Sequence, residues 1–215
     1  AAEQFGFDLH GPAPRFMPHT MPHIVYAAKA GAVASTGRYH SAMSCRAVLF
    51  ALDPAQIASL LALVGRDRAL LAYVREIEEA WDTDHLCELD KSWDALHRCF
   101  TDGRLSIGQG RNPLERAIMG GRNLLERTGL RRILAPPAAD ILTLVDPPDT
   151  AAIAAALQRV DKPWLAARYE SLPSGYGPTR GPEDLEYTWA YFLNLRDFYA
   201  KAAADFRAVL FSVDQ

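Results

Sequence analysis

The residues most suited to metal binding or acid–base chemistry lie between positions 82 and 90. Carboxylates, an imidazole and a thiol follow one another closely there, namely Asp82, Asp84, His85, Cys87, Glu88 and Asp90. Such side chains can bind a divalent cation, and Asp84, His85 and Cys87 are the candidate ligands. The segment has no HExxH, CxxC or EF-hand spacing, however. The alternative is a solvated loop between two helices, in which Asp90 caps the second helix.

His97 is the second candidate for chemistry, because a carboxylate lies near it on a predicted helix. Trp93 and Asp94 precede it by four and three residues, and residues at these spacings share one face of a helix. A general base needs such an orienting carboxylate, so Asp90, Lys91 and His97 form a candidate catalytic or ligand-binding group. A lone histidine beside an apolar stripe is also typical of a half-buried structural residue. Since no paired nucleophile is recognisable, we assign no catalytic residue.

A third candidate is the glycine-containing segment before residue 112. Gly108, Gln109 and Gly110 precede Arg111 and a predicted helix start at Asn112. Backbone N–H groups in such a place can bind an anion. The third glycine of a dinucleotide-binding fingerprint and the lysine of a P-loop are both absent. The sequence therefore leaves a flexible loop and an anion site open, and it predicts no cofactor.

Hydrophobic periodicity predicts the elements that would position these residues. Helices are expected after Asp53 and Asp67, and then over residues 90–100, 112–120, 147–157 and 183–206, and strands over 45–52, 132–134, 141–145 and 208–213. The same five residues, Arg-Ala-Val-Leu-Phe, begin at Arg46 and at Arg207. Neither run alternates with polar residues, so both are expected in a sheet covered on both faces. Helices outnumber strands without alternating with them, which predicts an α+β fold with a small, mostly antiparallel sheet packed with several helices.

The composition is that of an ordinary globular protein. Of 215 residues, 49% are hydrophobic and 23% charged, and the formal net charge is −3. This charge argues against nucleic acid as a partner, and no apolar run reaches the roughly 18 residues that a membrane-spanning helix needs. The three cysteines form no CxxC pair and fit the reduced thiols of a cytoplasmic protein.

The first 42 residues differ from the rest of the chain. They hold four of the six histidines and show no helical period, and Met43 directly precedes the first strongly patterned segment. We interpret residues 1–42 as an irregular N-terminal extension that comes from an upstream start or was added to the natural chain. Residues 43–215 are expected to form a single domain.

Several segments together resemble a known bacterial family. The segments are MSCRAVLFALDP (43–54), LDKSWDALHRCF (89–100), NPLERAIMGG (112–121), LAARYESLP (165–173) and LRDFYAKAAADFRAVLFSVD (195–214). They resemble the YfbM-like family, and the helix that carries Leu89, Asp90, Lys91, Trp93, Leu96 and His97 is the most specific of them. The resemblance implies a compact α+β domain and no established activity, so it carries no catalytic residue to this chain.

Two classes of function remain open at this point. The first is a non-catalytic protein-interaction module of regulatory or immunity type, whose partner would be another protein. Its recognition residues are expected on two surface loops, with Arg104, Arg111, Tyr176 and Arg180 as the candidates. The second is a small-ligand-binding protein or an enzyme that uses the group around His97. The sequence slightly favours the first class.

A chain beginning at Met43 is predicted to fold without the extension. It should melt cooperatively and keep its helical circular dichroism, because all five family-like segments lie after residue 42. Insolubility, or loss of most of the helical signal, would show that the extension is an integral part of the domain.

Overall fold

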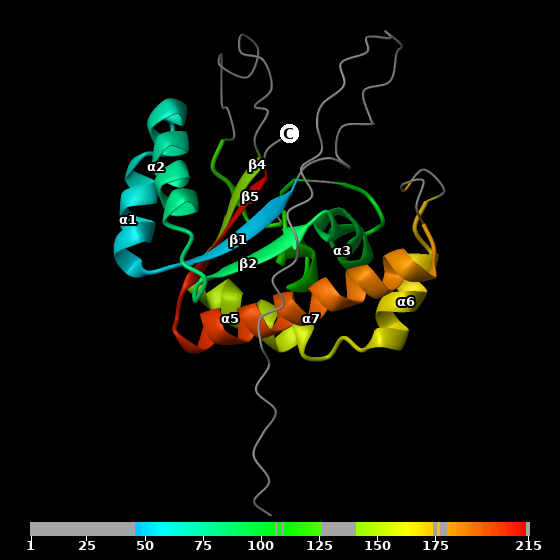
Figure 1. The fold of residues 1–215 in the computed structure, drawn as a ribbon. Coiled ribbons are helices and arrows are strands. Elements are labelled where there is room, and N and C mark those ends of the chain that lie inside the picture. Colours follow the sequence, from blue (N-terminus) through cyan, green and yellow to red (C-terminus); the bar gives the residue numbers. More distant parts are fainter. Residues whose placement is uncertain are drawn as a thin grey trace, which may run out of the picture. The chain divides into compact units, whose positions relative to one another are not determined.

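The two Arg-Ala-Val-Leu-Phe runs pair with each other at the centre of a sheet (Figure 1). Strand β1 (Ala47–Leu52) is antiparallel to β5 (Ala208–Val213), with Ala47 opposite Val213 and Leu52 opposite Ala208. Strand β2 (Leu86–Asp90) flanks β1, and β4 (Ile141–Val145) and the short β3 (Arg122–Asn123) follow on the other side of β5. All four pairings are antiparallel. The expected antiparallel sheet is therefore confirmed.

This computed structural model describes residues 46–105, 107–108, 110–125, 141–173, 176 and 180–213. The predicted extension and the strand predicted at 132–134 lie outside the described residues. The helical elements are α1 (Pro54–Ala62), α2 (Asp67–Ala80), α3 (Ser92–Phe100), the 3₁₀ turn η2 (Leu114–Arg116), α5 (Pro147–Leu157), α6 (Lys162–Glu170) and α7 (Pro182–Ala204). None of the helices in these ranges is long and apolar enough to cross a membrane.

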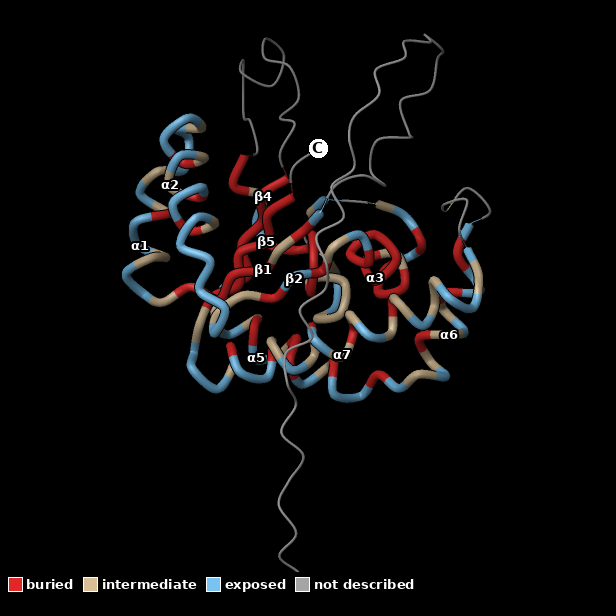
Figure 2. Tube along the Cα trace, viewed as in Figure 1, coloured by how far each residue is buried: buried red, intermediate tan, exposed pale blue. Residues whose placement is uncertain are grey.

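Both faces of the sheet are covered by helices, so the fold has three layers (Figure 1). On one face, Phe50 and Leu210 contact the apolar sides of α1 and α2. On the other face, Leu49 and Phe211 belong to a larger core with α3, α5, α6 and α7. Figure 2 shows that β1, β4 and β5 are buried almost throughout, whereas β2 also has exposed residues. Central strands that read as continuous apolar runs require this double cover.

Local sequence explains where the first helix begins. Asp53 accepts hydrogen bonds from the backbone N–H groups of Ala55 and Gln56, and the Gln56 side chain accepts one from the N–H of Asp53. This reciprocal capping box satisfies N–H groups that a helix start leaves without partners. The helix predicted after Asp53 is confirmed, as are those after Asp67, over 147–157 and over 183–206.

The loop predicted for residues 82–90 is present at 82–85 but is wrong for 86–90. Leu86–Asp90 is not an interhelical loop but strand β2, because its backbone pairs with β1 and Cys87 and Leu89 are buried. Helix α3 begins at Ser92, with Lys91 at its N-cap and no side-chain cap. Asp90 does not cap the helix: its φ is +44°, and its carboxylate instead accepts a hydrogen bond from Tyr187 at 2.9 Å.

Other boundaries also differ from the expectation. The helix predicted over 112–120 is reduced to η2, and α6 and β3 were not predicted. Three large hydrophobic residues at or beyond helix ends are exposed, namely Val64, Trp81 and Phe206. Trp81 and Phe206 follow the last residue of their helices in positive-φ conformations, where the helical period no longer directs a side chain toward the core.

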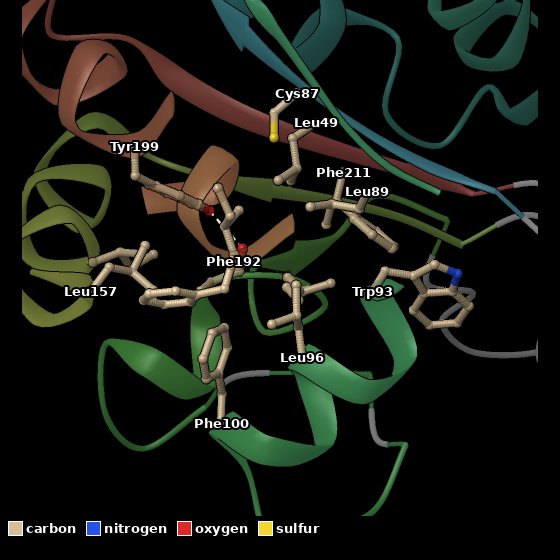
Figure 3. Close-up of a cluster of buried hydrophobic side chains, with 14 of the residues drawn as sticks. Leu49, Cys87, Leu89, Trp93, Leu96, Phe100, Leu157, Phe192, Tyr199 and Phe211 are labelled. Atoms are coloured by element: carbon tan, nitrogen blue, oxygen red, sulfur yellow. Dashed lines mark hydrogen bonds between the residues drawn. The ribbon is translucent and has the colours of Figure 1, made fainter. Parts of the chain in front are cut away.

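Trp93 lies in the larger core at the start of α3 (Figure 3). Its ring is 2% exposed and is tilted against that of Phe211, with 5.9 Å between the centroids. Leu96 and Phe100, on the same helix, are buried in the same cluster. Trp93 is therefore a core residue, as its helical spacing to Leu96 and Phe100 indicates.

Replacing this side chain should therefore be costly. Trp93→Ala is expected to lower the free energy of unfolding by about 3–5 kcal/mol, because the cavity cannot fully collapse. Trp81→Ala is the control and should cost less than about 1 kcal/mol, since Trp81 is 43% exposed. Denaturant melts of both variants provide the measurement, and equal losses would contradict the assignment.

Candidate functional site

A pocket of about 380 Å³ lies where α3 ends and the following loop begins. It is lined by His97, Thr101, Asp102, Ile107, Gly108, Gly110, Arg111 and Glu115. Its walls thus bring His97 together with the glycine-containing segment and Arg111, which are separate candidates in the sequence. Pockets of roughly this size and larger accommodate small ligands.

The predicted group of Asp90, Lys91 and His97 does not come together at this pocket. His97 lines it from α3 and is only 1% exposed. Lys91 is exposed, and Asp90 lies at the end of β2, where its carboxylate contacts Tyr187 and lies 3.3 Å from the Arg46 guanidinium. The three residues therefore do not form one site. Strand β2 ends at Asp90, before α3 begins at Ser92, and the Asp90 carboxylate accepts its hydrogen bond from α7.

A second hollow, of about 560 Å³, lies between β2 and α7. It is lined by Thr83, Asp84, Leu86, Cys87, Glu88, Tyr191, Asn194, Asp197, Phe198 and Lys201. We call it the β2–α7 groove. Its two walls are joined near their ends, where the Tyr187 hydroxyl donates to Asp90 and the Lys201 ammonium donates to the Asp84 carbonyl at 2.8 Å. The walls therefore run side by side in opposite directions.

The candidate metal ligands lie in or beside this groove. Asp84 is exposed, and the His85 Nδ1 atom lies 2.7 Å from the Asp82 carboxylate, a hydrogen bond that lowers the pKa of Asp82. The Cys87 thiol is buried, and burial raises its pKa to about 12. Within the described part of the chain, no group of three or more such side chains has a metal-binding arrangement.

The four predicted partner-binding residues differ in their surroundings. The Arg180 guanidinium donates to the carbonyl groups of Leu172, Tyr169 and Glu170 and thereby satisfies the C-terminal end of α6. Tyr176 packs edge-on against Tyr169, and the Arg98 guanidinium lies over its ring at 5.9 Å.

The other two predicted residues remain at the surface. The Arg104 side chain is 82% exposed and lies 3.9 Å from the Asp102 carboxylate. Arg111 is exposed at the first pocket. Of the two predicted loops, the one that follows α3 therefore offers the more accessible cations, because the Arg180 guanidinium is hydrogen-bonded to backbone carbonyl groups.

The wall of the groove on α7 was not predicted from the sequence. One stripe of this helix, with Phe192, Leu195 and Tyr199, is buried in the core. A second stripe faces the groove and consists of Tyr187, Tyr191, Asn194, Phe198 and Lys201, at spacings of four, three, four and three. That spacing is itself a helical face, so the signal was present in the sequence.

The arrangement defines an α+β domain with helices on both faces of an antiparallel sheet, a groove between β2 and α7, and a pocket at the end of α3. The model of a family described as a domain of unknown function, DUF1877, matches residues 43–212, and the chain belongs to this family. The solved structure of YfbM from Escherichia coli, a protein of unknown function, has a similar fold, with a TM-score of 0.53 at 16% identity over 78% of this chain and 99% of that one. No curated protein matches the sequence.

The buried thiols are predicted to be unreactive in the folded protein. Burial raises the pKa of both Cys87 and Cys99 to about 12, so on the order of 10⁻⁴ of each is thiolate at about pH 8, against about a quarter for an ordinary thiol. Iodoacetamide should therefore alkylate them only after unfolding in guanidinium, which mass spectrometry of the digested chain can measure. Rapid labelling of Cys87 in the folded protein would show that the groove exposes its sulfur.

Proposed function

We propose that this domain is a protein-interaction module whose β2–α7 groove binds an extended, basic segment of another protein. The observation that carries the proposal is an edge strand with a groove beside it. Among the described residues β2 pairs with β1 alone, so its other edge offers backbone groups to a further strand. Addition of a strand to such an edge is a common mode of peptide recognition.

The dimensions of the groove support an extended ligand. Its ends are marked by the two contacts that join β2 to α7, at Asp84 and at Asp90. Six residues of extended chain between these positions span about 20 Å. A peptide along β2 would also contact Tyr191 and Phe198, whose rings are half-buried in the α7 wall and offer apolar surface to alternate side chains.

Charge determines the kind of segment that fits. Carboxylates of Asp84, Glu88 and Asp197 line the groove, and Lys201 is the cation among its lining residues. The Lys201 ammonium already donates to the Asp84 carbonyl. A segment with lysine or arginine next to β-branched residues would therefore complement the groove in both charge and backbone pairing.

Selection from a display library of random peptides of about twelve residues tests this proposal. Enriched sequences should be basic and rich in β-branched residues, and they should shift the amide NMR signals of residues 86–90. Glu88→Lys should weaken their binding by about tenfold, because it places a like charge beside the ligand.

Glu79→Lys is the matched control. Glu79 is exposed on α2, on the opposite face of the sheet, so the same charge change there should leave binding within about twofold. Enriched peptides without basic residues, or equal effects of the two variants, would contradict the proposal.

A further inference from the structure

Arg111 is the cation among the described residues that line the pocket at the end of α3. Arg111 lines the pocket, and among the described residues its guanidinium makes no hydrogen bond or ion pair. A guanidinium offers five N–H donors in a planar fork that matches a carboxylate or a phosphate group. The free charge is therefore of the kind that recognises an oxyanion.

The carboxylates of the same pocket are already engaged. Glu115 accepts hydrogen bonds from the Arg111 backbone N–H at 2.6 Å and from the Asn112 side-chain amide at 2.7 Å. Asp102, at the rim, accepts the backbone N–H of Arg104 at 3.2 Å and lies near its guanidinium. Both negative groups thus have donors within the chain, whereas the Arg111 fork has no acceptor among the described residues.

The end of α3 would by itself oppose an anion, since a helix C-terminus carries partial negative charge. In this protein a positive side chain offsets the partial negative charge at the C-terminal end of α3. The Arg168 guanidinium donates to the carbonyl groups of Cys99, at 2.9 Å, and of Thr101. The His97 carbonyl accepts both the backbone N–H and the hydroxyl of Thr101. The wall formed by α3 therefore presents satisfied carbonyl groups.

The rest of the pocket fits a small molecule bearing that oxyanion. Ile107, 46% exposed, gives one wall an apolar surface, and the buried His97 contributes an imidazole to another. Gly110 lets the loop approach the turn that carries Glu115, because a Cβ at this position would lie 2.5 Å from the Glu115 Cβ. The loop thereby holds Arg111 at the pocket.

We propose that this pocket binds the carboxylate or phosphate group of a small metabolite through the Arg111 guanidinium. The site is distinct from the β2–α7 groove, because the two hollows have no lining residue in common within the described ranges. Its ligand is a small molecule, so the proposal does not depend on the groove being an interaction surface.

Titration of the full chain with inorganic phosphate, and separately with succinate, tests the site. Saturable shifts of the Gly108, Gly110 and Arg111 amide NMR signals are expected at near-physiological salt. A response to phosphate alone, or to succinate alone, identifies the source of the oxyanion, and either result supports the proposal. No saturable shift with either probe would overturn it.

Three variants distinguish the site from non-specific attraction. Arg111→Gln should weaken binding by about tenfold or more, because it removes the charge-assisted hydrogen bonds. Arg111→Lys should bind with intermediate affinity, since it keeps the charge without the planar fork. Arg75→Gln removes an exposed positive charge from α2, on the opposite face of the sheet, and it should change binding by less than about twofold. Equal losses in the variants at positions 75 and 111 would overturn the proposal.

Discussion

The fold depends on the antiparallel pairing of β1 with β5. These strands come from opposite ends of the family domain, and their pairing brings Leu49 opposite Phe211 and Phe50 opposite Leu210. Alternate residues of each strand face opposite sides, and nearly all are buried. Two covering layers are therefore required: α1 and α2 supply one, and α3, α5, α6 and α7 supply the other.

Helix α7 serves both the core and the surface. Its buried stripe includes Phe192 and Tyr199, and the Tyr199 hydroxyl donates to the Ala117 carbonyl at 2.8 Å, beside η2 (Figure 3). This bond satisfies a hydroxyl that would be costly to bury without a partner. The adjacent stripe, which includes Tyr191 and Phe198, forms one wall of the β2–α7 groove. Because the core holds the first stripe in place, the second is presented in a fixed orientation.

The two hollows lie at opposite ends of the segment formed by β2 and α3. The groove ends at Asp90, and the pocket begins at the far end of α3, which starts two residues later. Asp90 has a left-handed backbone conformation, which non-glycine residues adopt at a cost. Its contacts with Tyr187 and Arg46 stabilise that turn. The same residue thus ends the strand that lines the groove and directs the helix that lines the pocket.

The family-like segments and the periodic patterns determined the class of fold without any structure. Continuous apolar runs predicted the buried strands around Leu49 and Phe211, and the capping residues at Asp53 marked a helix start, because these signals act over a few neighbouring residues. The spacing from Trp93 to Phe100 likewise predicted the buried face of α3.

Contacts between distant segments determine the structure of residues 86–90 and which side chains share a site, and local sequence patterns do not. Leu86–Asp90 is a strand because β1 lies beside it, and Asp90 turns toward Tyr187, a residue 97 positions away. The sequence had grouped Asp90 with His97 by spacing alone, whereas the fold separates them and brings His97 to Arg111. Local sequence determines the conformations that a segment prefers, but pairing energies between distant segments decide which of them is formed and which side chains share a site.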